Sequence, residues 1–304
     1  MRPGDKILIQ EMEAKLASFS QTIKRIPGVR VVANKYCLAR QIIDSIRRVK
    51  YVTTISERVV SESISNPVLN SFNPLKAAVW HKNNANIDEA FWLIFLSTHF
   101  GKNKRTGWEL MRNVYGQLNS GNLWTWDLVI NHQAEFQDWI DENLDALSDT
   151  GKFSNHRKYE SLRLSGRVVT SYMHWVGEDF KHQQKIDSLV DLENDNSTWL
   201  FESLYNSMNS VFRFGRTAKF DYLCMVGKIG LADIQPGLTY MAGASGPIFG
   251  ARLLFGDDRL TPKQVEPILA ELNEHLDLYF GMQVLEDALC NWQKSPSSYI
   301  YFNG

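Results

Sequence analysis

The 304-residue chain contains only three cysteines, Cys37, Cys224 and Cys290, and no two of them form a C-x-x-C pair. This usage excludes a disulfide framework and a cysteine-based zinc or iron–sulfur site, and it indicates a reducing compartment. The histidines show no H-x-x-x-H spacing, and no Walker-type or G-x-G-x-x-G phosphate loop occurs where a strand would lead into a helix. We therefore expect no metal and no other cofactor.

Long hydrophobic runs are also missing. The most apolar stretch, residues 90–96 (AFWLIFL), is far shorter than the roughly 20 residues that a spanning helix needs. The chain begins MRPGDKILIQEMEAKL, where charges occur too early for a secretory signal. We therefore expect a cytoplasmic protein without a membrane partner.

A strong charge of one sign is absent too, since the net charge is −1. No global basic field attracts nucleic acid, so any such site has to come from local patches. Three basic clusters qualify, although each alone is more typical of plain surface; they are Lys102, Lys104, Arg105 and Arg112, then Lys152, Arg157, Lys158, Arg163, Arg167, Lys181 and Lys185, and then Arg213, Arg216, Lys219 and Lys228. The sequence does not show whether they converge on one face.

Helical spacing dominates the chain, and strand alternation is scarce. Apolar residues recur at i, i+3 and i+4 over 7–19 and 36–49. A Pro- and Asn-rich break follows at 66–74 (NPVLNSFNP). We predict an all-α fold with an N-terminal helical region over 1–85 and a second helical domain over 86–304.

Local signals predict where several helices begin and end. Thr261-Pro262-Lys263-Gln264 is a capping-box sequence with proline at the first helical position. The other expected elements are a helix capped by Asp88 and running to Phe100, one capped by Thr106 to Leu118, a long helix over 125–147 with an acidic face, one capped by Thr217 and ended by Gly227 or Gly230, and a last helix over 282–293.

A glycine-rich stretch at 239–256 (TYMAGASGPIFGARLLFG) interrupts this helical pattern. We predict a helix-hairpin-helix there, with a tight turn of two to four residues that needs positive φ and a bare backbone. Its N–H groups at the start of a helix would bind a DNA phosphate. The DNA-binding candidates are Gly243, Ser245, Gly246 and Gly250, with Arg216, Lys219 and Arg252 supplying cations. The alternative is an ordinary loop.

The order of elements over about 211–294 resembles helix-hairpin-helix base-excision DNA glycosylases. Met241-Ala242-Gly243-Ala244-Ser245-Gly246 stands where those proteins have L-P-G-x-G, with one inserted residue at the turn.

A second resemblance covers about 98–296 and rests on four strings: THFGKNKRTGWELMRNVYG, FGRTAKFDYLCMVGKIGL, GASGPIFGARLLFG and GMQVLEDALCNWQKSP. Together they resemble the third clade of the α-glutamyl/putrescinyl thymine pyrophosphorylases. The resemblance implies a glycosylase scaffold acting on hypermodified bases. It also implies a partner, double-stranded phage DNA, since such families include anti-phage glycosylases that excise glucosylated hydroxymethylcytosine.

Cleavage of an N-glycosidic bond needs a carboxylate that stabilises an oxocarbenium-like sugar and orients water. Three aspartates compete for this role. Asp257 and Asp258 follow the predicted hairpin, where a solvent-exposed turn is the alternative. Asp221 lies in the basic helix, where an intrahelical ion pair is the alternative.

The flipped base needs a pocket, for which the candidates are His99, Lys102, Trp108 and Asp287. Pro247-Ile248-Phe249 offers no lysine where bifunctional glycosylases carry one, so we predict a monofunctional DNA glycosylase that leaves an abasic site. Two other functions stay open: a base-modifying transferase that displaces pyrophosphate from activated thymine, and a non-catalytic DNA-binding protein.

Overall fold

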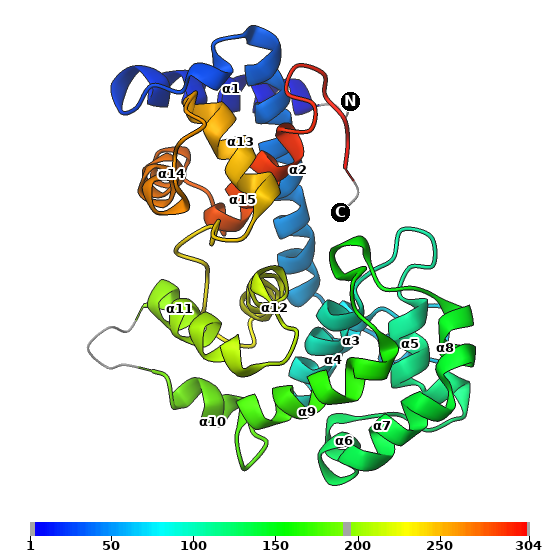
Figure 1. Cartoon of the computed structure of the whole chain (residues 1–304). Helices are drawn as coiled ribbons and strands as arrows, with labels where there is room; N and C mark the ends of the chain where they lie inside the picture. Colours follow the sequence, from blue (N-terminus) through cyan, green and yellow to red (C-terminus); the bar gives the residue numbers. More distant parts are fainter. Residues whose placement is uncertain (1–3, 191–195, 303–304) are drawn as a thin grey trace. The chain divides into compact units, whose positions relative to one another are not determined.

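The computed structural model describes residues 4–190 and 196–302. The regular secondary structure of these segments is helical (Figure 1). They contain 15 α-helices, six short 3-10 helices and one isolated β-bridge, between Asn103 and Gly107. The predicted all-α class is therefore confirmed. No described helix combines the length and the apolar character needed to cross a bilayer.

The chain divides into two compact units, which we call unit 1 (Met1–Tyr51 with Pro236–Gly304) and unit 2 (Val52–Gln235). The boundaries of the two units lie after Tyr51 and after Gln235, whereas the sequence suggests a boundary near residue 85. The first 51 residues group with the C-terminal third of the chain, and the switch from unit 1 to unit 2 lies inside one helix, α2.

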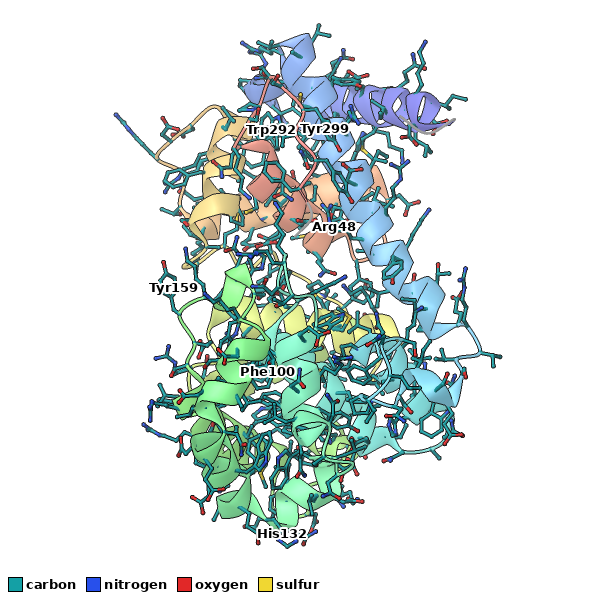
Figure 2. The ribbon with its side chains drawn as sticks, turned by 90° about the vertical axis from the view of Figure 1, so that its right-hand side faces the viewer. Arg48, Phe100, His132, Tyr159, Trp292 and Tyr299 are labelled. Atoms are coloured by element: carbon teal, nitrogen blue, oxygen red, sulfur yellow. The ribbon has the colours of Figure 1, made fainter. Side chains whose placement is uncertain are left out.

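Unit 1 packs helices from distant parts of the sequence side by side, blue against orange and red in Figure 1. They are α1 (Asp5–Thr22), most of α2 (Val32–Ser56), α13 (Ser245–Phe255), α14 (Pro262–Leu276) and α15 (Gly281–Trp292). Their apolar faces form one core that includes Phe19, Ile42, Leu254, Leu272 and Trp292. Arg48 in α2 and Trp292 in α15 lie in this unit (Figure 2).

Unit 2 is built around one buried helix, α4. Its other helices are α3 (Pro74–Asn83), α5 (Glu109–Tyr115), α6 (Trp126–Asn131), α7 (Gln133–Glu142), α8 (Leu144–Thr150), α9 (Ser165–Val176), α10 (His182–Asp187), α11 (Ser197–Ser207) and α12 (Arg216–Ile229). Helix α4 (Ile87–Phe100) carries the 90–96 apolar run, whose residues are at most 3% exposed. A helix that is apolar on all sides is expected to lie at the centre of a fold.

Predicted helix ends were confirmed where the signal is local. Thr261 and Gln264 form the capping box of α14, and Gly230 ends α12 in the left-handed conformation. Residues 7–19 and 36–49 lie within α1 and α2 as predicted.

Other predicted ends were wrong. The single helix over 125–147 is three short helices, α6 to α8, with non-helical breaks at His132 and Asn143. Asn86, not Asp88, occupies the N-cap of α4, and α12 begins after Gly215, not at Thr217. Helix α5 begins at Glu109 and ends at Tyr115, three residues short of Leu118.

Candidate nucleic-acid interface and active site

Two of the three basic clusters meet in unit 2 where two loops lie against each other. Ser154 N–H donates to the Phe100 carbonyl at 2.9 Å, and Asn103 Nδ2 donates to the Phe153 carbonyl at 3.0 Å. Gly101 permits this approach, because a Cβ at its positive φ of 67° would lie 2.1 Å from Ser154 Oγ. The exposed cations of the two loops are Lys102, Lys104, Arg105, Lys152 and Lys158.

The third cluster joins the same loops through Glu160. This carboxylate, 9% exposed, accepts from Arg213 Nε at 3.0 Å and lies 3.6 Å from Arg157 Nη2. Arg213 Nη2 also donates to the Tyr159 carbonyl at 2.5 Å. The segment 151–160 is thus fixed to the turn that precedes α12, and residues from all three basic clusters lie along connected loops of one unit.

His99 is a buried residue that contacts the segment 151–160 through Arg157. It is fully buried, its Nε2 lies 3.1 Å from Ser165 Oγ, and its carbonyl accepts from Arg157 Nε at 3.2 Å. Burial, and then the positive charges of Arg157 and Arg213, lower the pKa of His99 well below its usual value. A neutral, fully buried imidazole thus supports the cationic loops.

Asp221 projects from α12 toward the same loops. Its Oδ2 lies 4.0 Å from His156 Nδ1, and the two side chains are 45% and 63% exposed. A carboxylate beside an imidazole is a pairing that can hold and orient a water molecule. Of the three candidate aspartates, Asp221 is the one in unit 2, where the basic loops lie.

The remaining candidates of unit 2 lie in different settings. Lys102 is exposed, and Trp108 is half-buried at the N-cap of α5. Arg216 stacks 5.1 Å from the Phe220 ring. Lys219 is only 6% exposed and donates to Asn209 Oδ1 at 2.6 Å, and burial lowers the pKa of its ammonium group.

The glycine-rich stretch belongs to unit 1, and its glycines have three separate roles. Gly243 has a positive φ of 78° in an exposed turn, and Gly256 ends α13 in the left-handed conformation. Gly246 and Gly250 lie inside α13 and allow close packing, because a Cβ on Gly250 would lie 2.3 Å from the Leu289 carbonyl oxygen. On Gly246 it would lie 2.7 Å from Cys290 Sγ.

The predicted tight turn between two helices was wrong. Helix α12 ends at Ile229 and α13 begins at Ser245, so a connection of fifteen residues, 230–244, separates them. The predicted start of a helix at the glycines is correct, with Ser245 exposed in the first turn. Only Ser245 and Gly246 carry N–H groups in the first three positions of α13, because Pro247 is the third.

Glu266, which sequence patterns did not single out, holds the approach to α13. Its carboxylate accepts from Thr239 N–H at 2.7 Å, from Thr239 Oγ1 at 2.9 Å and from Met241 N–H at 2.9 Å. Thr239 is fully buried as a result. The exposed turn at Gly243 therefore starts from a fixed backbone.

The acidic candidates of unit 1 do not share one site. Asp257 and Asp258 are exposed after α13, and Asp257 Oδ1 accepts from Arg259 N–H at 2.9 Å. Arg252 Nε donates to the Leu260 carbonyl at 2.9 Å across the same turn. Asp287 Oδ2 instead binds Arg48, at 2.9 Å from Nε and 2.5 Å from Nη2, and links α15 to α2.

A mostly apolar groove of about 560 Å³ lies in unit 2, and one of its lining residues, Phe212, directly precedes Arg213 of the third basic cluster. Its lining residues come from α7, α9 and the turn before α12: Gln133, Ala134, Gln137, Gly166, Arg167, Thr170, Ser171, His174 and Phe212. The Arg167 guanidinium lies 4.2 Å from the centre of the Phe212 ring, and Ser171 Oγ accepts from Phe212 N–H at 2.8 Å. No local sequence pattern indicates this groove, because its lining residues are scattered over 80 positions.

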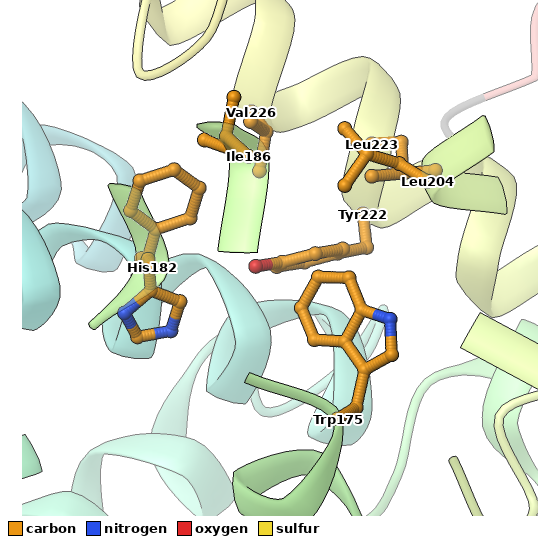
Figure 3. Close-up of a pocket in the computed structure, with 8 residues that line it drawn as sticks. Trp175, His182, Ile186, Leu204, Tyr222, Leu223 and Val226 are labelled. Carbon is orange, nitrogen blue, oxygen red and sulfur yellow. The ribbon is translucent and has the colours of Figure 1, made fainter. Parts of the chain in front are cut away.

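A second cavity of unit 2, about 10 Å³, holds one water molecule at most (Figure 3). Trp175 and Tyr222 reach into this space from α9 and α12. A buried chain of hydrogen bonds passes beside it, from Asp88 Oδ1 to His182 Nδ1 (2.9 Å), from His182 Nε2 to Tyr172 Oη (2.7 Å) and on to Tyr222 Oη (2.8 Å).

The chain from Asp88 to Tyr222 is a structural element of the core. Burial acts to raise the pKa of Asp88, but hydrogen bonds from His182 and Lys181 outweigh it and hold that pKa below its usual value. Burial lowers the pKa of His182 and raises those of Tyr172 and Tyr222. All four groups are satisfied when neutral His182 donates to Asp88 and accepts from Tyr172.

No group of three or more His, Cys, Asp or Glu side chains in the described segments is arranged to hold a metal ion. Cys37, Cys224 and Cys290 form no disulfide. The basic loops and the adjoining start of α12 present carboxylate, imidazole, ammonium and guanidinium groups.

An all-helical scaffold that gathers cations and a carboxylate–imidazole pair on connected loops fits the class of enzymes that act on nucleic acid. Residues 33–304 match the family described as alpha-glutamyl/putrescinyl thymine pyrophosphorylase clade 3, and the chain belongs to that family. The match indicates an enzyme related to DNA modification. Searches among curated proteins and among solved structures gave no match.

Proposed function

We propose that this protein is a monofunctional DNA glycosylase that excises a hypermodified base from phage DNA. The observation that carries the proposal is the meeting of the basic segments 102–105, 152–158 and 213–216 in one unit, next to Asp221 and His156. Lysine and arginine side chains on such loops neutralise backbone phosphates and position the duplex without reading its sequence. Because the net charge is −1, affinity for DNA has to come from such local basic patches.

In the proposed reaction, the target base leaves the stack and its sugar faces Asp221. The C1′–N bond breaks, and the carboxylate stabilises the positive charge that develops on the sugar. A water molecule between Asp221 and His156 adds to C1′ and gives up a proton to one of them. The departing base takes a proton in turn, so the products are a free base and an abasic site.

The groove at Arg167 and Phe212 is large enough for a base that carries a bulky substituent, since small-molecule sites range from about 300 to 1,000 Å³. Its larger apolar part suits a flat base, and its amide, hydroxyl and imidazole groups suit a polar substituent. In this proposal it replaces His99 as part of the base pocket, because His99 is fully buried. A sugar-modified cytosine is the substrate that the resemblance implies.

The test uses duplex oligonucleotides carrying glucosylated hydroxymethylcytosine, hydroxymethylcytosine or unmodified cytosine. Abasic sites and free base are measured with Asp221→Asn, Asp257→Asn and Asp258→Asn, each alone. We expect base release from the glucosylated duplex and a loss of about 100-fold or more in Asp221→Asn. Asp138→Asn, an exposed aspartate of α7, is the matched control and should keep full activity.

Two results would change the proposal. Loss of activity in Asp258→Asn or Asp257→Asn, with Asp221→Asn active, would move the catalytic role to the turn after α13. Absence of free base from every modified duplex, under conditions where the protein binds DNA, would rule out the glycosylase itself.

The second candidate function is a transferase or pyrophosphorylase that acts on activated thymine in DNA, and the family's own description favours it. Such an enzyme would release pyrophosphate when an amine displaces it from the thymine. The same assay distinguishes the two, because pyrophosphate release from pyrophosphorylated-thymine DNA leaves the glycosidic bond intact. A gel shift with neither product would instead indicate a DNA-binding protein without catalysis.

A further inference from the structure

Tyr159 exposes 79% of its surface at the tip of the segment 151–160, the largest fraction among the aromatic side chains that the structure describes (Figure 2). The other strongly exposed aromatic side chains range from 55% for Phe249 to 63% for Tyr279. A large aromatic ring that faces water gives up the stabilisation that burial would provide. The exposed ring of Tyr159 therefore contributes little to the fold and is accessible to a partner.

The backbone beneath Tyr159 is fixed on both sides. Arg213 Nη2 donates to the Tyr159 carbonyl at 2.5 Å, and Glu160 N–H donates to the Arg157 carbonyl at 2.9 Å. Arg157 itself is 8% exposed and bonded to the His99 carbonyl. The segment thus holds its main chain firmly while presenting the ring outward, and little ordering entropy is lost when the ring binds a partner.

The surroundings of the ring are cationic. Lys158 Nζ lies 4.9 Å from the ring centre, and Lys152, Lys102 and Lys104 lie on the two loops that contact each other. The acidic residue of the segment, Glu160, is engaged by Arg157 and Arg213. A partner that fits must bring negative charge and flat aromatic surface together, and a nucleic acid strand has both.

We propose that Tyr159 stacks on a nucleobase of bound DNA while Lys158 and the neighbouring lysines contact the flanking phosphates. This inference rests on the proposed function only in taking DNA as the partner, and it holds for any catalytic carboxylate. Stacking on an aromatic ring is sequence-tolerant, so Tyr159 would bind the strand without selecting a particular base.

The test measures binding of duplex DNA that carries 2-aminopurine at successive positions. Affinity and 2-aminopurine fluorescence are compared for the full-length protein and its Tyr159→Ala, Tyr159→Phe and Tyr279→Ala variants. We expect Tyr159→Ala to bind about 5- to 100-fold more weakly. The fluorescence change should persist in Tyr159→Phe and disappear in Tyr159→Ala, and Tyr279→Ala, an exposed tyrosine of unit 1, should match the unaltered protein.

The salt dependence of binding separates stacking from a collapsed loop. Loss of a neutral ring leaves the slope of log K against log salt unchanged, whereas a displaced segment also stops neutralising phosphates and flattens the slope. Tyr159→Ala with unchanged affinity and unchanged fluorescence would overturn this inference and leave the glycosylase proposal standing. A lower affinity with a flattened slope would overturn it too, and failure of the unaltered protein to bind any DNA would overturn both.

Discussion

Glu89 is a carboxylate buried in the core of unit 2, 3% exposed, and its local contacts explain why the fold tolerates it. It accepts from Tyr115 Oη at 2.6 Å and from Trp126 N–H at 2.7 Å, which ties α4 to α5 and to the start of α6. Burial raises its pKa from 4.5 to about 7, against the opposing effect of the two hydrogen bonds. A single side chain thereby couples the packing of three helices to pH.

The Glu89→Gln variant should remove this coupling. Because the folded state binds the Glu89 proton more tightly than the unfolded state, the stabilisation is complete below pH 4.5 and is lost as pH rises through about 7. Relative to Glu89→Gln, the unaltered protein should therefore lose on the order of 3 kcal/mol between pH 4.5 and 8. Urea unfolding at several pH values measures this difference, and parallel curves for the two proteins would contradict it.

Lys219 was predicted to bind DNA, but the residue is 6% exposed and its Nζ donates to Asn209, so its interactions stabilise the fold. Its Nζ also lies 4.0 Å from the centre of the Tyr205 ring. We expect Lys219→Met to lower the free energy of unfolding by about 0.5–1.5 kcal/mol, because the charge-assisted hydrogen bond to Asn209 is lost, although water can replace it at this exposed amide. DNA affinity, measured well below the melting temperature, should change less than twofold; a large loss of affinity in a stable variant would restore Lys219 to the interface.

At the scale of the elements, the contact between α13 and α15 explains half of the glycines in the 239–256 stretch. Gly246 and Gly250, four residues apart, form a bare strip along α13 against which Leu289 and Cys290 pack. Glycine spacing alone fits two interpretations equally well: close packing of two helices, and a phosphate-binding turn with positive φ. The distinction depends on which helix lies opposite, and that information is absent from the local sequence.

Gly250→Ala should be destabilising although alanine favours helix. The added Cβ would lie 2.3 Å from a backbone oxygen, and overpacking of this kind costs about 1–3 kcal/mol, more than the gain in helix propensity of roughly 0.5–1 kcal/mol. The exposed neighbour gives the matched control, Phe249→Ala, which should change stability by less than about 0.5 kcal/mol. A thermal melt in which Gly250→Ala equals or exceeds the unaltered protein would show that α13 and α15 pack differently.

How far the sequence predicts the elements depends on where the determining contact lies. The capping box at Thr261 and Gln264 is complete within four residues, and its prediction was confirmed. Asp88 was expected to cap its own helix, but it binds Lys181 and His182, which lie more than 90 positions away. The breaks at His132 and Asn143 carry no proline or glycine, and their local hydrogen bonds, to Glu135 and to the Trp139 carbonyl, do not stand out in the sequence.

For the whole molecule, the distribution of charge says more than its sum. The basic clusters are separate in sequence, and the contacts of Glu160, Asn103 and Ser154 join them within unit 2. The sequence predicts the cations and the three candidate aspartates. The sequence does not predict that Asp221, alone among the three aspartates, shares a unit with these cations. It also does not predict the groove at Phe212 in the same unit, because both features follow from how the chain folds.

Charge removal at the loop tip should weaken DNA binding through its salt-dependent component. The double variant Lys104→Ala/Arg105→Ala should lower the slope of log K against log salt by about 2, one for each phosphate that is no longer neutralised. Lys24→Ala/Arg25→Ala removes the same charge from exposed positions of unit 1 and should leave the slope unaltered. Equal effects of the two double variants would mean that the interface is not confined to the loops of unit 2.

The division of unit 1 between two distant segments has a consequence for how the protein is made. Unit 2 is one continuous stretch, whereas the core of unit 1 joins α1 and most of α2 to α13, α14 and α15, which are synthesised after unit 2. We expect unit 2 to acquire protease resistance during translation while the apolar faces of α1 and α2 still await their partners. Until residue 236 and beyond have been synthesised, those faces are open to chaperones, and a nascent chain halted there would be the form of this protein most prone to aggregate.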